Sequence, residues 1–150
     1  MPEPEPYELA LRALGQKERT EAELAGWLRE RGVEETELHE AIARLAEAGA
    51  LDDERFARRF AEDKRELRGW GPDRIAEALR GRGVEESLIA AALAAEEPEA
   101  TVARAVEVLE EGGRELGDEA GRNRALALLA RRGYPLEVAY DAVRAFERNG

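Results

Sequence analysis

An internal repeat of about 50 residues constrains this chain more than any other feature of its sequence. Three segments share an apolar and arginine-rich stretch that ends in a glycine, namely Gly32, Gly83 and Gly133. Apolar residues recur at matched distances from these glycines, and those eight positions earlier are Leu24, Ile75 and Ala125. A fixed period with matched apolar positions is typical of proteins that stack copies of one small unit.

Each copy is predicted to contain three short helices. The glycine suits the position just after a helix, where a left-handed conformation satisfies the last carbonyls. Acidic residues follow it in the first two copies and Pro135 follows it in the third, and both favour the start of the next helix. A further helix is predicted ahead of each pair, at about 7–14, 53–67 and 99–111. Thr20 and Glu23 have the spacing of a capping box, which predicts a helix start between them.

The predicted fold is all-α. Ala, Leu, Glu and Arg dominate the chain and favour helices, whereas no segment is rich in β-branched and aromatic residues. We predict repeats at 7–51, 52–97 and 98–149, after a disordered Pro- and Glu-rich segment at 1–6. A three-helix unit buries little apolar surface alone, so the repeats are expected to stack into an elongated, curved array, right-handed or solenoid-like.

The charge balance limits the kinds of partner. The net charge is −11, which argues against a protein that binds nucleic acid through bulk electrostatics. It favours a protein partner or binding through a local basic patch. The longest apolar run, 88–95, is too short to span a membrane, and the N-terminus lacks the pattern of a signal peptide. We therefore expect a cytoplasmic protein.

The sequence offers no catalytic constellation. It has no cysteine, which excludes a disulfide scaffold and a thiolate zinc site. His39 is the single histidine, and its place in the helical pattern predicts a surface position. No nucleophile with a base and no phosphate-binding loop is found. We expect no enzymatic activity, no cofactor and no metal. No long apolar stripe remains for self-association, so a monomer is expected.

A local basic patch interrupts this acidic chain. Residues 55–82 contain nine basic and five acidic residues, a local charge of +4. Arg58, Arg65 and Arg68 have the spacing of one helical stripe, and Trp70 follows them. Arginine and tryptophan are common interface anchors. The candidate partner-binding residues are Arg58, Arg59, Lys64, Arg65, Arg68, Trp70 and Arg74. The alternative is a solvated helix face with pairs such as Arg58–Glu62.

The same region carries a family resemblance. The stretch from Leu51 to Phe60 reads LDDERFARRF, and it is followed by Gly71-Pro72, Arg74-Ile75 and Gly83-Val84. This pattern resembles the signature of the RecX family. The flanking repeats extend the resemblance over nearly the whole chain after its Pro-rich start, and three tandem three-helix repeats are the family's architecture.

The resemblance implies a regulator of the RecA recombinase in DNA repair, the SOS response and homologous recombination. RecX proteins bind the RecA filament on single-stranded DNA, lie in its groove, and typically inhibit the ATPase, strand-exchange and coprotease activities of RecA. The family has no catalytic residues. Some members bind DNA weakly, but the net charge of −11 predicts weak or no direct nucleic-acid binding here.

Two other interpretations remain open. Three-helix units also resemble helix-turn-helix proteins, which would make this a DNA-binding protein. That interpretation predicts a basic recognition helix, whereas the third helix of the first copy, near 34–45, is acidic. The other alternative is a generic helical scaffold for a different protein.

Overall fold

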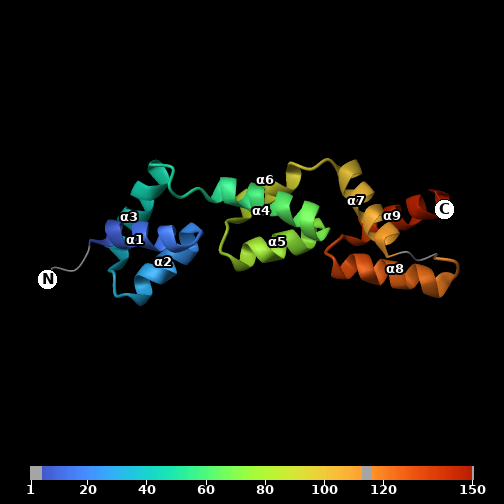
Figure 1. The fold of residues 1–150 in the computed structure, drawn as a ribbon, viewed down its shortest axis with the longest axis horizontal. Helices are drawn as coiled ribbons and strands as arrows, with labels where there is room; N and C mark the ends of the chain where they lie inside the picture. The colour runs from blue at the N-terminus through green and yellow to red at the C-terminus, as the bar shows by residue number, and fades with distance from the viewer. Residues whose placement is uncertain (1–4, 113–115, 150) are drawn as a thin grey trace.

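The computed structural model describes residues 5–112 and 116–149, and these residues form nine α-helices and no strand (Figure 1). The helices are α1 (Pro6–Gln16), α2 (Glu21–Glu30), α3 (Glu35–Glu47), α4 (Asp53–Arg68), α5 (Pro72–Gly81), α6 (Glu86–Ala94), α7 (Pro98–Glu111), α8 (Glu119–Arg131) and α9 (Leu136–Asn149). The all-α prediction is confirmed. Of the segment predicted to be disordered, Glu5 caps α1 and Pro6 begins it, while 1–4 lie outside the described residues.

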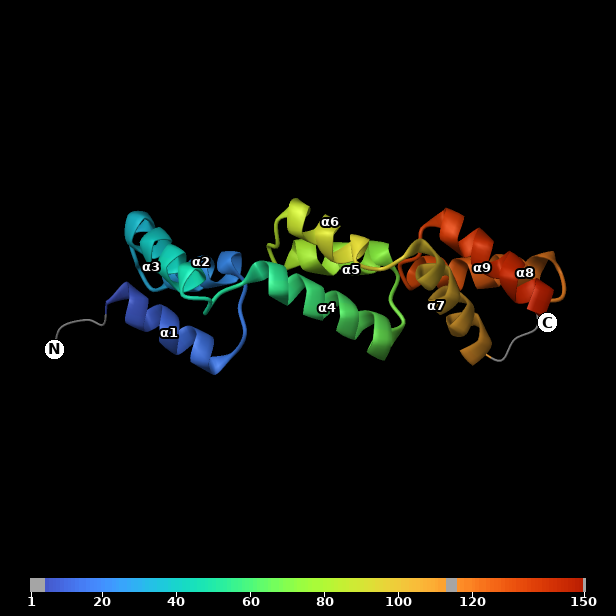
Figure 2. The same cartoon turned by 90° about the horizontal axis from the view of Figure 1, so that it is seen from above.

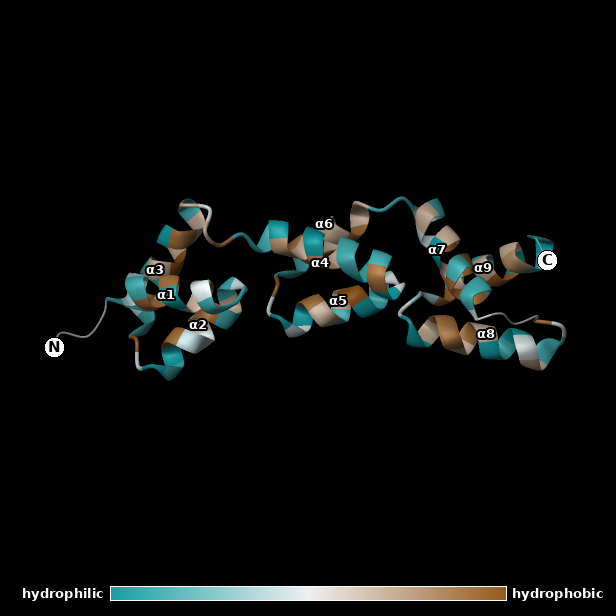
Figure 3. Ribbon diagram, viewed as in Figure 1, coloured by the Kyte–Doolittle hydropathy of each residue, from teal (hydrophilic) through white to brown (hydrophobic). Residues whose placement is uncertain are grey.

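The helices form three groups of three. α1 to α3 pack mainly on one another, as do α4 to α6 and α7 to α9. Each group has a separate apolar core, and Figure 3 shows hydrophobic and hydrophilic residues interspersed along its helices. Figures 1 and 2 show the groups in an elongated row, with the first and third repeats at its two ends. The predicted tandem array of three-helix repeats is therefore confirmed.

The predicted local signals begin and end the helices. Thr20 and Glu23 form the capping box, since Thr20 Oγ1 accepts from the Glu23 N–H and the Glu23 carboxylate accepts from the Thr20 N–H. Gly32, Gly83 and Gly133 all have positive φ, at +80°, +80° and +95°. A side chain would strain this conformation, which explains why the repeated position holds glycine.

The middle helices of the repeats form an end-to-end row. The C-terminal turn of α5 rests on the N-terminus of α2, and that of α8 rests on the N-terminus of α5; the row follows the lower side of Figure 1. At the first joint Thr20 Oγ1 donates to the Arg82 carbonyl, 2.7 Å away. At the second joint the Gly71 N–H donates to the Arg132 carbonyl over 2.8 Å. One docking geometry therefore joins all three repeats.

Candidate functional site

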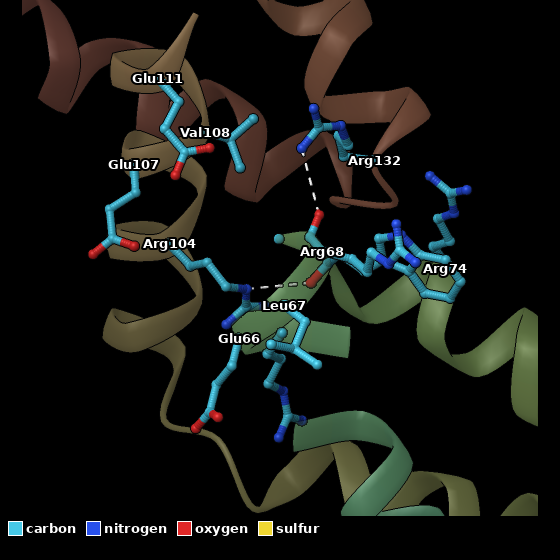
Figure 4. Close-up of a pocket in the computed structure, with 12 residues that line it drawn as sticks. Glu66, Leu67, Arg68, Arg74, Arg104, Glu107, Val108, Glu111 and Arg132 are labelled. Carbon is cyan, nitrogen blue, oxygen red and sulfur yellow. Dashed lines mark hydrogen bonds between the residues drawn. The ribbon is translucent and has the colours of Figure 1, made fainter. Parts of the chain in front are cut away.

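A polar cleft of about 470 Å³ lies where the second repeat meets the third (Figure 4). The ends of α4 and α8, the start of α5 and one side of α7 surround it. Five arginines from both repeats line it, namely Arg65, Arg68, Arg74, Arg104 and Arg132. Such a concentration of guanidinium groups suits the recognition of carboxylates or phosphates.

A glycine turn brings the second repeat's residues to the cleft. α4 ends at Arg68 because Gly69 takes a left-handed conformation, with φ +64°. The Gly69 and Trp70 N–H groups bond back to carbonyls in the last turn of α4, which closes the helix and reverses the chain. Trp70 thus lines the cleft beneath two cations: the Arg74 guanidinium and Lys64 Nζ lie 4.2 Å and 4.9 Å from its ring centroid. Both distances are within cation–π range.

The floor of the cleft contains a nearly buried ion cluster. The Glu96 carboxylate contacts Arg104, lies 3.6 Å from Arg65, and accepts a 2.6 Å hydrogen bond from the Thr101 hydroxyl. The side chains of the three charged residues are only 11–14% exposed. One carboxylate thus neutralises one of two guanidinium groups, and a positive charge remains in the floor.

Arg104 also holds the two repeats together. Its Nε donates to the Trp70 carbonyl over 3.2 Å and to the Tyr134 hydroxyl over 3.1 Å, and that hydroxyl donates to the Gly69 carbonyl over 2.8 Å. Burial raises the pKa of Tyr134, although Arg104 opposes the shift, so the phenol remains a donor at neutral pH. Arg104 Nη2 is buried and has no hydrogen-bond partner among the described residues. An unsatisfied buried donor is a cost to folding, which the other contacts of Arg104 offset.

The rim of the cleft has one basic and one acidic wall. Arg68, Arg74 and Arg132 stand on one side, while Glu107 and Glu111 project from α7 on the other (Figure 4). A polyanion such as a nucleic-acid backbone would meet these carboxylates as it approached the arginines. A protein segment with separate acidic and basic side chains matches both walls.

The structure brings four of the predicted partner-binding residues into this cleft: Arg65, Arg68, Trp70 and Arg74. Arg65 contributes in a different way from that expected. Its side chain is 13% exposed and donates to the Ala92 carbonyl, whereas Arg58 and Arg68 are exposed. The exposed stripe expected for Arg58, Arg65 and Arg68 is therefore interrupted, because Arg65 packs between α4 and the end of α6.

The other three predicted residues lie outside the cleft lining. Lys64 lies over the rings of Phe60 and Trp70. Arg59 pairs with Glu18 of the first repeat. Arg58 pairs with Glu54 over 3.1 Å, so its neighbour on the helix is the acid four residues before it and not Glu62. The order Glu–x–x–x–Arg is the more favourable one in a helix, because the acid lies nearer the N-terminus.

Sequence reasoning missed three residues that complete the site: Glu96, Arg104 and Arg132. Alignment of the repeats could have identified Arg132, since it precedes Gly133 just as Arg82 precedes Gly83. Nothing in the sequence marks Arg104. Elsewhere, His39 is exposed, as its place in the helical pattern predicts. Its Nε2 lies 3.3 Å from the Glu35 carboxylate.

Among the described residues no group of three or more His, Cys, Asp and Glu side chains has the arrangement of a metal site. Within 5–112 and 116–149, no helix combines the length and apolarity that a membrane crossing requires.

Comparison with known proteins identifies the family. Residues 7–45 match the family model described as the first three-helix domain of RecX, and residues 52–93 match that of the second. The regulatory protein RecX of Mycobacterium sp. (strain KMS) is 34% identical over 148 residues, covering 94% of this chain and 81% of that protein. That of Halorhodospira halophila is 38% identical, covering 93% and 87%.

A solved structure agrees with the fold. The crystal structure of RecX from Lactobacillus salivarius superposes with a TM-score of 0.87 over 95% of each chain, at 20% sequence identity. Sequence matches over most of the chain and the shared three-repeat architecture give the same answer: this chain belongs to the RecX family of regulatory proteins.

Proposed function

We propose that this protein binds the RecA–DNA filament as a monomer in the cytoplasm and lowers the ATPase, recombinase and coprotease activities of RecA. Family membership supports the RecA partner. The observation that carries the mode of binding is the cleft between the second and third repeats, where five arginines and Trp70 converge. The protein acts by binding and carries out no reaction of its own.

The proposed contact surface consists of the cleft rim and the exposed outer face of α4. Arg68, Trp70 and Arg74 make the direct contacts, and Lys64 and Arg58 extend the surface along the helix. Arg59 and Arg65 act indirectly. The ion pair of Arg59 with Glu18 joins the first two repeats, and Arg65 helps to hold Glu96, which pairs with Arg104 of the third repeat. The elongated row of repeats is suited to lie along a filament groove and to contact neighbouring protomers.

A protein surface fits the cleft better than nucleic acid does. Glu107 and Glu111 face the arginines, and the chain as a whole carries a charge of −11. Both features oppose the approach of a polyanion. We therefore propose weak or no binding to free DNA, which separates this function from that of a helical DNA-binding protein.

The first experiment is a titration of DNA-stimulated ATP hydrolysis by the cognate RecA with this protein. Inhibition well below one molecule per RecA protomer would indicate capping or destabilisation of filaments, and inhibition only near saturation would indicate coating of the groove. Unchanged hydrolysis together with no co-sedimentation on RecA–DNA filaments would contradict the proposal.

Matched variants locate the contact surface. The double variant Arg68→Glu, Arg74→Glu should weaken co-sedimentation with the filament at least about tenfold, because two glutamates then repel the acidic side chains proposed to meet the basic wall. The control Arg12→Glu, Arg148→Glu changes the net charge equally at exposed arginines outside the cleft. Equal losses in both double variants would point to general charge and not to the cleft. Anisotropy with free single-stranded DNA tests the DNA-binding alternative.

A further inference from the structure

The two joints between repeats use the same structural element. At each joint the turn at the C-terminus of one middle helix places its last carbonyls on the N-terminus of another. The Arg82 carbonyl accepts from Thr20 Oγ1 at the start of α2, and the Gly133 carbonyl accepts from the Asp73 N–H at the start of α5. The negative end of one helix dipole thereby meets the positive end of the next.

This element needs glycine for two reasons: its positive φ, and the close contact that it makes with the neighbouring repeat. A Cβ on Gly83 would lie 2.5 Å from the Ala22 Cβ, and one on Gly133 would lie 2.5 Å from the backbone nitrogen of Arg74. The element is therefore a compact knob formed by an arginine, a left-handed glycine and an apolar residue. The helix start that receives it is the socket.

A third knob stands at the N-terminal end of the row. Arg31, Gly32 and Val33 follow α2, and Gly32 has the same φ as Gly83, +80°. A Cβ on Gly32 would meet nothing within 4 Å, and the Arg31 carbonyl accepts no hydrogen bond within the described part of the chain. Val33 is half-buried, whereas Val84 and Tyr134 in the docked knobs are 4% and 3% exposed.

We propose that the knob Arg31–Val33 docks onto the N-terminus of a helix in a partner protein. The Arg31 carbonyl would accept from a hydroxyl or N–H at the start of that helix, as the Arg82 carbonyl does from Thr20. The guanidinium would receive a carboxylate three residues further on, as Arg82 receives Glu23. Arg31 is already held 3.5 Å from the Trp27 ring centroid, which reduces the entropy lost on docking.

A second copy of this chain is not the occupant. Thr20 and Gly71 stand twelve residues before the glycine of their repeats, and the matching residue of the third repeat is Gly121. The Leu116 carbonyl already packs against Gly121, in the position that Gly133 takes against Gly71. The socket of the third repeat is thus filled by its own chain, which prevents head-to-tail assembly and leaves an external helix as the partner.

A peptide probe tests this docking independently of RecA. The probe is a helical peptide that begins with Thr-Glu-Ala-Glu, the residues 20–23 of the first socket, on an alanine- and lysine-rich host. Titration of the isotope-labelled full chain at millimolar peptide should shift the amide resonances of Arg31, Gly32 and Val33. Shifts absent from this turn, or equal over the whole surface, would overturn the proposal.

Two substitutions sharpen the test. Gly32→Val should abolish the shifts through steric contact, whereas Gly49→Val should leave them unchanged; Gly49 also has a positive φ, +79°, and open space around it. Arg31→Glu should lose the original peptide and bind one in which lysine replaces the second glutamate. Retained binding in Gly32→Val, or no rescue by the lysine peptide, would contradict the docking geometry. Since no filament is present, failure here leaves the proposed action on RecA untouched.

Discussion

The two joints share a docking geometry but treat charge in opposite ways. Nine residues before the repeat glycine stands Glu23 in the first repeat and Arg74 in the second. At the first joint Arg82 makes two hydrogen bonds to Glu23, at 2.7 and 2.9 Å. At the second joint the matching residues are Arg74 and Arg132, and both line the cleft. The first joint satisfies its arginine internally, whereas the second leaves its arginines available to a partner.

Arg74 and Arg132 carry like charges at the second joint, and other interactions hold that joint closed. Two backbone hydrogen bonds join the start of α5 to the end of α8, and the Glu96 cluster joins α4, α6 and α7. The joint therefore gains its stability in the floor of the cleft and leaves the charge of the rim unpaired. One repeated contact thus forms an internal ion pair in one place and leaves charge unpaired in another, where we propose the binding site.

The largest expected effect comes from breaking the second joint at Glu96. Glu96→Gln leaves Arg65 and Arg104 facing each other with little exposure, and we expect a loss of about 3 kcal/mol in the free energy of unfolding. Urea denaturation measures the loss. Glu110→Gln is the control, because Glu110 is an exposed glutamate on the neighbouring helix α7. A loss below about 1 kcal/mol would show that the cluster contributes little to the joint.

Substitution of the three repeat glycines tests how closely each joint is packed. Gly133→Ala, Gly83→Ala and Gly32→Ala all place a side chain at positive φ, at a cost of about 1 kcal/mol. The first two add steric overlap across a joint, which raises the loss to about 2–3 kcal/mol. Gly133→Ala should be the most damaging, because backbone atoms of Arg74 oppose it. Thermal unfolding gives the order, and equal losses for the three would contradict the shared docking geometry.

Much of this architecture was predictable because its signals are local and periodic. The repeated glycines, the capping box at Thr20 and the apolar periodicity determine the helices within a few residues. The start of α8 also has a local signal, since the Asp118 carboxylate caps the helix by accepting a hydrogen bond from the Gly121 N–H.

The partners of long charged side chains were much less predictable. Arg65 could be placed on α4 from the sequence, but its contact with Glu96 depends on how α6 ends and how α7 begins. Arg59 likewise finds Glu18, 41 positions away in the chain. Helix position follows from local pattern, whereas ion pairing between helices follows from packing that one sequence does not display.

Exchanging the charges of the joints gives an effect of intermediate size. Arg74→Glu recreates the first joint's pair with Arg132, so we expect stability to rise by up to about 1 kcal/mol. Binding to the filament should weaken about tenfold in co-sedimentation, because the cleft loses its surplus charge. The reciprocal Glu23→Arg should destabilise the first joint and leave filament binding within about twofold. A stability loss in Arg74→Glu would show that the joints are not equivalent.

The smallest expected effect is a pH dependence of the first joint. Burial raises the pKa of Glu23, but hydrogen bonds from Arg82 and Thr20 outweigh it and lower the pKa below its ordinary value. Its stabilising contribution is therefore present above the unfolded pKa of about 4.3 and is lost as pH falls through the folded pKa. Glu21 behaves oppositely, because burial and the nearby Asp53 raise its pKa. Its contribution is greatest below the unfolded pKa and falls as pH rises through the folded pKa.

Two substitutions separate the opposite effects of Glu23 and Glu21 on the pH dependence of stability. At pH 7, Glu23→Gln should lower the free energy of unfolding and Glu21→Gln should raise it, each by about 0.5 kcal/mol after screening by solvent. At acidic pH, once each glutamate is protonated, both variants should approach the wild type, since glutamine resembles a protonated glutamate. Denaturation at the two pH values measures these differences. If Glu23→Gln were as stable as the wild type at pH 7, the first joint would not depend on its internal ion pair, and the contrast with the second joint would reduce to steric docking alone.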